Sequence, residues 1–149
     1  FYDDFVAEMV RLAEAATPGD PMNPQKGDYF PLSSRDAAET LDEQVKRAVA
    51  DGATLHTGGE LTGDGAYFTP AVITGIPVGS ESFYEEFFGP VVEVYKAASE
   101  EEAIELANDS HYGLGGAVFS TDEQRAKNVA NRIETGMIHV NIPQARGAE

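Results

Sequence analysis

Apolar residues among the first 16 positions recur at the spacing of an amphipathic helix, and the Thr-Pro-Gly sequence that follows ends this pattern. The proline-rich stretch from 19 to 31 predicts an irregular surface loop. Ser33, with Asp36 three positions later, predicts a capping box for a second helix that ends near residues 51–52. The apolar residues of this second segment again share one helical face.

Short runs rich in apolar and β-branched residues predict strands at 53–56, 71–74, 91–95, 116–120 and 137–140. Two helical patterns lie among the later runs, one capped by Ser99 with Glu102 and the other by Thr121 with Gln124. Strands that alternate with helices of roughly 10–15 residues imply crossover connections between parallel strands. The pattern therefore predicts an α/β fold with a mostly parallel sheet and helices on both faces. We expect no interior linker that divides the chain.

Composition and charge narrow the classes of partner. The chain of 149 residues is 42% hydrophobic, which is enough to build a packed globular core. Its 26 Asp and Glu residues outnumber its 10 Lys and Arg residues, which gives a net charge of −16. Such a surface repels polyanions, so we expect neither a nucleic-acid partner nor an anionic membrane partner. No run approaches the roughly 18 apolar residues of a membrane span, and no secretory signal is visible, so we expect a cytoplasmic protein.

Several common kinds of site lack their residues or their spacing. The sequence contains no cysteine, which excludes disulfides, thiolate metal sites and a cysteine nucleophile within these residues. The carboxylates do not follow the spacing of an EF-hand calcium loop. His56, His111 and His139 show no metal-ligand spacing, so we expect packing or surface roles for them. The glycine clusters at 58–65 and 113–116 have neither the spacing nor the strand–helix context of a dinucleotide-binding loop.

The segment from Phe83 to Val92 is different, because two adjacent carboxylates, Glu85 and Glu86, lie in an aromatic run that leads into Gly-Pro and an apolar strand. A carboxylate beside buried surface is costly unless it accepts strong hydrogen bonds. The residues alone leave two interpretations open. In one, the carboxylate caps a local turn or pairs with an arginine. In the other, it accepts hydrogen bonds from vicinal hydroxyls such as those of a ribose, while an aromatic ring flanks a planar heterocycle.

The run Glu85-Glu86-Phe87-Phe88-Gly89-Pro90-Val91 resembles the Glu-Glu-x-Phe-Gly-Pro-Val motif of the aldehyde dehydrogenase superfamily. Further segments resemble those of the family in the expected order: 68–72, 103–108, 112–114, 118–122 and 136–141. The resemblance extends over essentially all 149 residues. Residues 108–116 and the segment from 141 to 149 are most similar to succinate-semialdehyde dehydrogenases.

This resemblance implies an enzyme that oxidises an aldehyde to a carboxylic acid with NAD or NADP as the cofactor. In the family, a cysteine thiolate attacks the aldehyde, the thiohemiacetal gives a hydride to nicotinamide, and a glutamate-activated water hydrolyses the thioester. By alignment of the motif, Glu86 corresponds to the glutamate that hydrogen-bonds the nicotinamide ribose, and Phe88 to the ring beside the nicotinamide. Arg146, in the segment that approaches the substrate in the family, is a candidate partner for a substrate carboxylate, and a surface arginine is the alternative.

The resemblance also implies that much of the machinery lies outside these residues. The nucleophilic cysteine, the general-base glutamate, the oxyanion asparagine and the dinucleotide-binding domain are expected before Phe1, and an oligomerisation strand after Glu149. We therefore expect residues 1–149 to be a partial catalytic domain, inactive alone, of a protein that forms homo-oligomers at full length. A non-catalytic interaction or assembly module with the same fold is the alternative. The choice between NAD and NADP belongs to the expected dinucleotide-binding domain.

Overall fold

The chain divides into two compact units, residues 1–95 and residues 96–149. The computed structural model describes residues 1–63 and 65–143. The sequence shows no interior linker, and the division into two units was not predicted from it. The boundary follows Tyr95 in the sequence Tyr-Lys-Ala-Ala, which has none of the glycine, proline or serine that usually marks a linker.

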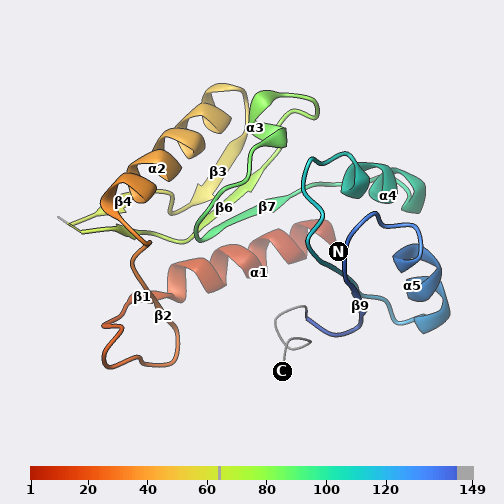
Figure 1. Ribbon diagram of the computed structural model, residues 1–149, viewed down its shortest axis with the longest axis horizontal. Helices are drawn as coiled ribbons and strands as arrows, with labels where there is room; N and C mark the ends of the chain where they lie inside the picture. The colour runs from red at the N-terminus through yellow and green to blue at the C-terminus, as the bar shows by residue number, and fades with distance from the viewer. Residues whose placement is uncertain (64, 144–149) are drawn as a thin grey trace. The chain divides into compact units, whose positions relative to one another are not determined.

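A three-stranded sheet with the order β3-β6-β7 organises the first unit (Figure 1). β6 (Ala71–Thr74) is the central strand. β3 (Thr54–Thr57) runs antiparallel to it, and β7 (Val91–Val94) runs parallel to it. The parallel register pairs Ala71 with Val91, so the first residue of β7 comes directly from the motif segment.

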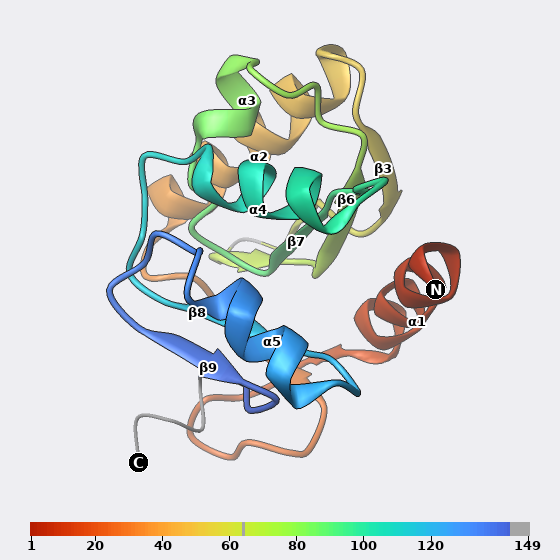
Figure 2. The ribbon, with the colours of Figure 1, turned by 90° about the vertical axis from the view of Figure 1, so that its right-hand side faces the viewer.

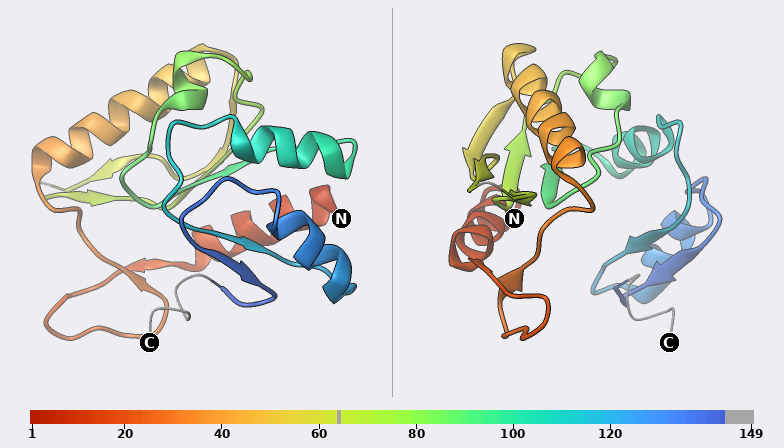
Figure 3. Two further views of the ribbon diagram at one scale, coloured as in Figure 1. Left: turned by 45° about the vertical axis from the view of Figure 1, so that its right-hand side comes forward. Right: turned by 60° about the vertical axis from the view of Figure 1, so that its left-hand side comes forward.

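Helices cover both faces of this sheet, as the sequence pattern predicts. α1 (Tyr2–Ala15) contacts β3 and β6 on one face, and α2 (Arg35–Ala50) packs on the other (Figures 1 and 3). Adjacent strand residues point to opposite faces, and both Val72 and Ile73 of β6 are buried. The core cluster on the α2 side consists of Leu41, Val45, Ala48, Ala53, Phe68, Ile73, Ile76 and Phe87.

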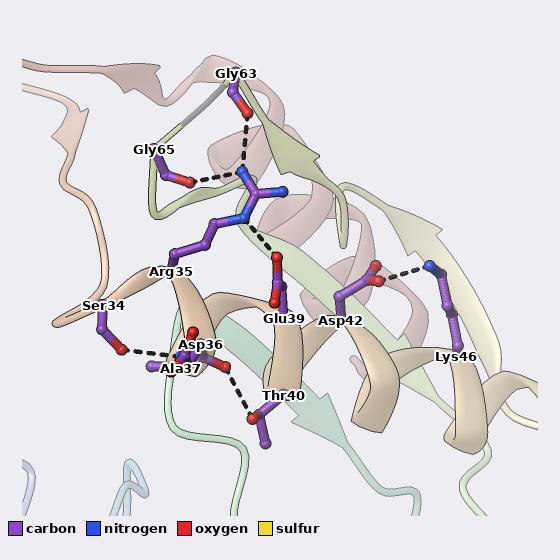
Figure 4. Close-up of polar contacts among 10 residues, drawn as sticks. All are labelled: Ser34, Arg35, Asp36, Ala37, Glu39, Thr40, Asp42, Lys46, Gly63 and Gly65. Carbon is purple, nitrogen blue, oxygen red and sulfur yellow. Dashed lines mark hydrogen bonds and ion pairs between the residues drawn. The ribbon is translucent and has the colours of Figure 1, made fainter.

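α2 begins one residue later than the predicted capping box. Ser34, rather than Ser33, is the N-cap, and its hydroxyl accepts a hydrogen bond from the Ala37 amide at 3.0 Å (Figure 4). Both serines carry the same capping group, so the path of the chain into the helix decides between them. Arg35 in the first turn donates to the carbonyl oxygen of Gly63 at 3.2 Å, which ties the start of α2 to the turn that follows residues 61–62.

The prediction of a mostly parallel sheet is wrong for β3 and β6, which are antiparallel. The described residues between these strands contain no helix and instead form a second antiparallel pair, β4 (Leu61–Thr62) and β5 (Tyr67–Phe68). Gly58, with a φ of 63°, lies where a Cβ would be 1.9 Å from the carbonyl oxygen of Pro70, so only glycine fits there. A hairpin connection of this kind allows antiparallel pairing, whereas parallel strands need a crossover.

The predicted loop from 19 to 31 is closed by two short strands. β1 (Thr17–Pro18), which precedes the loop, pairs in parallel with β2 (Asp28–Tyr29), which lies inside the range predicted as irregular. The Tyr67 hydroxyl donates to the carbonyl oxygen of Gly19 at 2.7 Å, so the loop is also attached to the hairpin.

The second unit alternates helices and strands: α4 (Glu100–Asn108), β8 (Gly116–Val118), α5 (Glu123–Ala130) and β9 (Ile138–Val140). β8 and β9 form a parallel pair, and α5 packs against both of them (Figure 2). Ser99 caps α4 as predicted, since its hydroxyl accepts from the Glu102 amide at 3.1 Å. α5 is capped by Asp122 rather than by the predicted Thr121, because the Asp122 carboxylate accepts from the Arg125 amide at 3.0 Å.

The α/β class is confirmed, but its strands form four small sheets rather than one sheet within the described residues. No helix of the described part of the chain is both long enough and apolar enough to cross a membrane.

Candidate functional site

The motif segment, residues 85–91, begins where a short helix ends. α3 (Glu81–Tyr84) is capped by Ser80, whose hydroxyl accepts from the Phe83 amide at 3.2 Å. The next residue, Glu85, has extended backbone angles of φ −79° and ψ 149°. The chain therefore leaves α3 in an extended conformation.

Side chains of the motif segment alternate between the core and the surface. Phe87 belongs to the core cluster and is 8% exposed, whereas Phe88 is 76% exposed. The two carboxylates differ in exposure in the same way: the Glu85 side chain is 21% exposed, and Glu86 is an exposed residue. By their exposure, Glu86 and Phe88 both lie on the surface side of the segment, whereas Glu85 and Phe87 lie on the side of α2 and the core.

The two adjacent carboxylates have different partners. Glu85 Oε1 accepts from Arg47 Nη2 of α2 at 2.5 Å, which is the arginine pairing that the sequence left as one interpretation. Among the described side-chain atoms, Glu85 Oε2 and Arg47 Nε are buried without a hydrogen-bond partner. The Glu86 carboxylate forms no ion pair or hydrogen bond with the residues that the structure describes. Its backbone carbonyl accepts from Gln44 Nε2 at 3.3 Å. The carboxylate oxygens of Glu86 are therefore available to a ligand.

The Gly-Pro pair of the motif joins the segment to the core and to the sheet. A Cβ on Gly89 would lie 2.3 Å from Leu41 Cδ2, and Leu41 is 1% exposed, so a larger side chain would displace a packed core residue. The Pro90 carbonyl accepts from the Ala71 amide at 2.8 Å, which starts the parallel pairing of β6 with β7. Both ends of the segment are thus held by the first unit.

A second pair of titratable groups, Glu93 and Tyr95, lies near the end of β7. The Tyr95 hydroxyl donates to Glu93 Oε2 at 2.9 Å. Burial raises the pKa of the Glu93 carboxyl, and burial together with the Glu93 charge raises the pKa of the Tyr95 hydroxyl. The Tyr95 ring packs edge-on against Phe83 of α3, with ring centroids 5.4 Å apart. We infer that this pair has a structural role, because Tyr95, held by Glu93, packs against α3.

The structure gives the following positions for the other residues considered from the sequence. His56 lies 2.8 Å from Thr74 across β3 and β6, from Nε2 to Oγ1, and His139 lies on β9 in the second unit. Arg146 lies outside the described residues. Within the described residues, no three His, Cys, Asp or Glu side chains are grouped as a metal site would require.

An apolar cavity of about 410 Å³ lies in the second unit. Ile104, Val118 and Ile138 contribute to its lining, from α4, β8 and β9. Of its described lining residues, only Glu134 is charged at neutral pH, and Tyr112 and Thr135 contribute side-chain hydroxyls.

Three residues that support the motif segment, Leu41, Gln44 and Arg47, were not identified from the sequence. The position of Arg47 could have indicated a structural role, because Arg47 is a charged residue beside Val45 and Ala48, which are buried positions of α2. Its partner Glu85 is 38 positions away, and local spacing does not predict that pairing.

Comparison with known proteins gives consistent results. Residues 1–149 match the aldehyde dehydrogenase family. The chain is 44% identical over 149 residues to a succinate-semialdehyde dehydrogenase [NADP(+)] of Deinococcus radiodurans, covering 99% of this chain and 31% of that protein.

Solved structures of the family are similar as well. The crystal structure of succinic semialdehyde dehydrogenase from Streptococcus pyogenes with NADP+ has a TM-score of 0.87 and 45% identity, over 94% of this chain and 31% of that one. Betaine aldehyde dehydrogenase from Staphylococcus aureus with NAD+ has a TM-score of 0.86 and 34% identity, over 93% of this chain and 28% of that one. The chain thus spans about a third of these relatives. Because the family match covers every residue, the chain belongs to the aldehyde dehydrogenase family.

Proposed function

We propose that this chain is part of the catalytic domain of an NAD(P)-dependent aldehyde dehydrogenase, and that Glu86 and Phe88 contact the nicotinamide end of the cofactor. One observation carries the proposal: the motif segment presents a carboxylate without a described partner and an exposed aromatic ring on the same side. Glu85 and Phe87 meanwhile anchor the opposite side of the segment. The cofactors named for the relatives from Streptococcus pyogenes and Staphylococcus aureus support this proposal.

The residues fit this end of the cofactor chemically. An ionised carboxylate offers two acceptor oxygens, which suit the two vicinal hydroxyls of a ribose. An exposed phenyl ring offers a flat apolar surface beside which a planar heterocycle packs. Phe88 is 76% exposed, whereas its neighbour Phe87 is packed in the core.

The role of Glu86 and Phe88 is to orient rather than to react. A nicotinamide cofactor, when bound, accepts the hydride that the substrate carbon loses. Glu86 fixes the ribose through hydrogen bonds, and Phe88 limits the positions open to the attached ring. Correct orientation of reacting groups is worth several orders of magnitude in rate, so both residues act on the rate of hydride transfer.

The nucleophile belongs to another part of the protein. These 149 residues contain no cysteine, and the family reaction uses a cysteine thiolate. We therefore expect the chain alone not to oxidise aldehydes, whatever the cofactor.

The first experiment tests Glu86 in the full-length enzyme. Glu86→Gln keeps the size of the side chain but removes its charge, which weakens hydrogen bonds to a diol. We expect hydride transfer to slow roughly ten- to a hundredfold and a primary isotope effect with a deuterated aldehyde to increase. Glu81→Gln, an exposed change on α3, is the control and should leave both values unchanged. An unchanged isotope effect in Glu86→Gln would refute the role of this residue.

We infer that the substrate is an aldehyde that also carries a carboxylate, with succinate semialdehyde as the leading candidate. The named substrates of the relatives from Deinococcus radiodurans and Streptococcus pyogenes support this inference. Arg146 is the proposed partner of the carboxylate, because a guanidinium binds a carboxylate through two parallel hydrogen bonds. This role rests on the sequence alone.

The second experiment compares two aldehydes with the full-length enzyme and its Arg146→Ala variant. We expect kcat/KM for succinate semialdehyde to fall roughly ten- to a hundredfold, and kcat/KM for a neutral aldehyde of similar length to stay unchanged. Equal losses on both aldehydes would exclude a carboxylate-binding role for Arg146.

A further inference from the structure

Three residues along one side of α2 contact the motif segment. Leu41, Gln44 and Arg47 are spaced three apart, so they lie along one side of the helix. Their partners run in the opposite order: Arg47 binds Glu85, Gln44 binds the carbonyl of Glu86, and Leu41 meets Gly89. The segment therefore lies antiparallel to α2, with a contact at each of these three positions.

The contact of Arg47 differs from the other two because it is directional and charged. The pair is partly shielded from water, with side-chain exposures of 40% for Arg47 and 21% for Glu85. Arg47 Nε and Glu85 Oε2 are buried without hydrogen-bond partners within the described structure, so loss of either residue leaves a partly shielded charge without its counter-ion. An apolar contact alone would allow the motif segment to slide or rotate along α2. The ion pair with Arg47 instead holds the Glu85 side chain against α2.

The orientation of Glu85 decides the orientation of the residues that follow. Exposure alternates along the segment, from Glu85 directed toward α2, through the exposed Glu86 and the buried Phe87, to the exposed Phe88. We propose that Arg47 is a positioning residue, which holds Glu85 against α2 and thereby keeps Glu86 and Phe88 directed outward toward the nicotinamide end of the cofactor. This inference rests on the proposed function of Glu86 and Phe88.

The neighbouring cation of α2 provides a matched control. Lys46 pairs with Asp42 within the helix, at 2.6 Å from Nζ to Oδ2 (Figure 4). Its side chain is 73% exposed, and its ion pair does not involve the motif segment. Lys46→Met therefore removes a cation and an ion pair from the same helix without loss of the contact to Glu85.

The first measurement needs no cofactor. Amide hydrogen exchange is followed in the full-length enzyme without NAD or NADP, in the wild type and in the Arg47→Met and Lys46→Met variants. We expect exchange of the Gly89 and Val91 amides, which donate to the carbonyl oxygens of Phe87 and Gly89, to be at least about tenfold faster in Arg47→Met, because the segment opens locally. Lys46→Met should leave this exchange unchanged.

The second measurement is the isotope effect on hydride transfer. Arg47→Met and Glu85→Gln should each slow hydride transfer by about tenfold or more and increase the isotope effect. The double variant should lose little more than either single variant, because both changes break the same interaction. Arg47→Lys should recover part of the rate, since it keeps the charge but not the fork of the guanidinium.

The outcomes separate this inference from the proposed function. If Glu86→Gln increases the isotope effect but Arg47→Met changes neither the isotope effect nor the exchange of the Gly89 and Val91 amides, the positioning role is overturned and the proposed function stands. If Glu86→Gln leaves the isotope effect unchanged, the proposed function fails, and Arg47 cannot position a site that is absent. Should Arg47→Met fail to fold, Glu85→Gln is a smaller change that decides the question by the same two measurements.

Discussion

Glu85 and Glu86 are chemically identical neighbours with opposite environments, and the contrast comes from the backbone. The extended segment directs the first toward Arg47 and the second toward solvent. A third carboxylate, Glu93 on β7, is half-buried and has the Tyr95 hydroxyl as its hydrogen-bond partner. An arginine compensates the burial of Glu85, whereas burial of Glu93 raises its pKa.

The raised pKa of Glu93 predicts a pH-dependent cost to stability. Between the ordinary carboxyl pKa in the unfolded chain and the raised pKa in the folded chain, the folded state binds more protons. Stability from this group is therefore lost as pH rises through the raised pKa. We expect Glu93→Gln to increase the urea midpoint of unfolding at neutral pH, with a gain that shrinks toward about pH 4 and below, where the carboxyl is protonated in both states.

The control for this measurement is Glu81→Gln on the exposed first turn of α3, which should not change the urea midpoint across the same pH series. A gain from Glu93→Gln of the same size at every pH would contradict the linkage argument.

At the scale of elements, α2 has two functions in the first unit. Its buried residues Leu41, Val45 and Ala48 build the core over the sheet, and Arg47 beside them holds the motif segment. The start of the helix is defined by Ser34 and by the contact of Arg35 with the hairpin. The stability of α2 and the geometry of the candidate site are therefore linked.

The two serines before α2 provide a direct test of where the helix begins. Ser34→Ala removes the hydroxyl that accepts from the Ala37 amide, and we expect a loss of about 1 kcal/mol in the free energy of unfolding. Ser33→Ala alters an exposed hydroxyl outside the cap and should change this free energy by less than about 0.5 kcal/mol. Urea denaturation of both variants measures the difference, and a larger loss in Ser33→Ala would support the capping box expected from the sequence instead.

At the scale of the whole molecule, the excess of negative charge dominates the electrostatics. The net charge is −16, and many of the basic residues already take part in ion pairs: Arg11, Arg35, Lys46, Arg47, Arg125, Lys127 and Arg132. Each exposed pair contributes only about 0–1 kcal/mol. Repulsion among the remaining carboxylates acts over the entire surface and opposes the compact state.

Salt should therefore stabilise this protein. Raising KCl from about 0.1 M to about 1 M shortens the Debye length from about 10 Å to about 3 Å, which screens the repulsion among carboxylates more than it weakens the few ion pairs. We expect the thermal unfolding midpoint to rise with KCl, as in an enzyme adapted to a high-salt cytoplasm. A midpoint that is highest at the lowest ionic strength would contradict this expectation.

Hydrophobic spacing and turn residues were sufficient to predict the α/β class, the cap of α4 at Ser99, and the approximate positions of α1, α2, α4, α5, β3, β6, β7, β8 and β9, because these features depend on neighbours a few positions apart. They did not predict α3 or the two-residue strands β1, β2, β4 and β5. The motif from Glu85 to Val91 was sufficient to identify the family, and the profile match confirms that prediction. The proposed roles of Glu86 and Phe88 also come from the motif, and they stay predictions until the variants are measured.

Tertiary structure decided the rest. It determined that β3 and β6 are antiparallel, that the chain divides after Tyr95, and that Glu85 rather than Glu86 pairs with Arg47. Local spacing contains no information about such contacts, because they join residues far apart in the chain and depend on how whole elements pack. Two adjacent glutamates therefore have the same local pattern and acquire different environments only when α2 packs over the sheet.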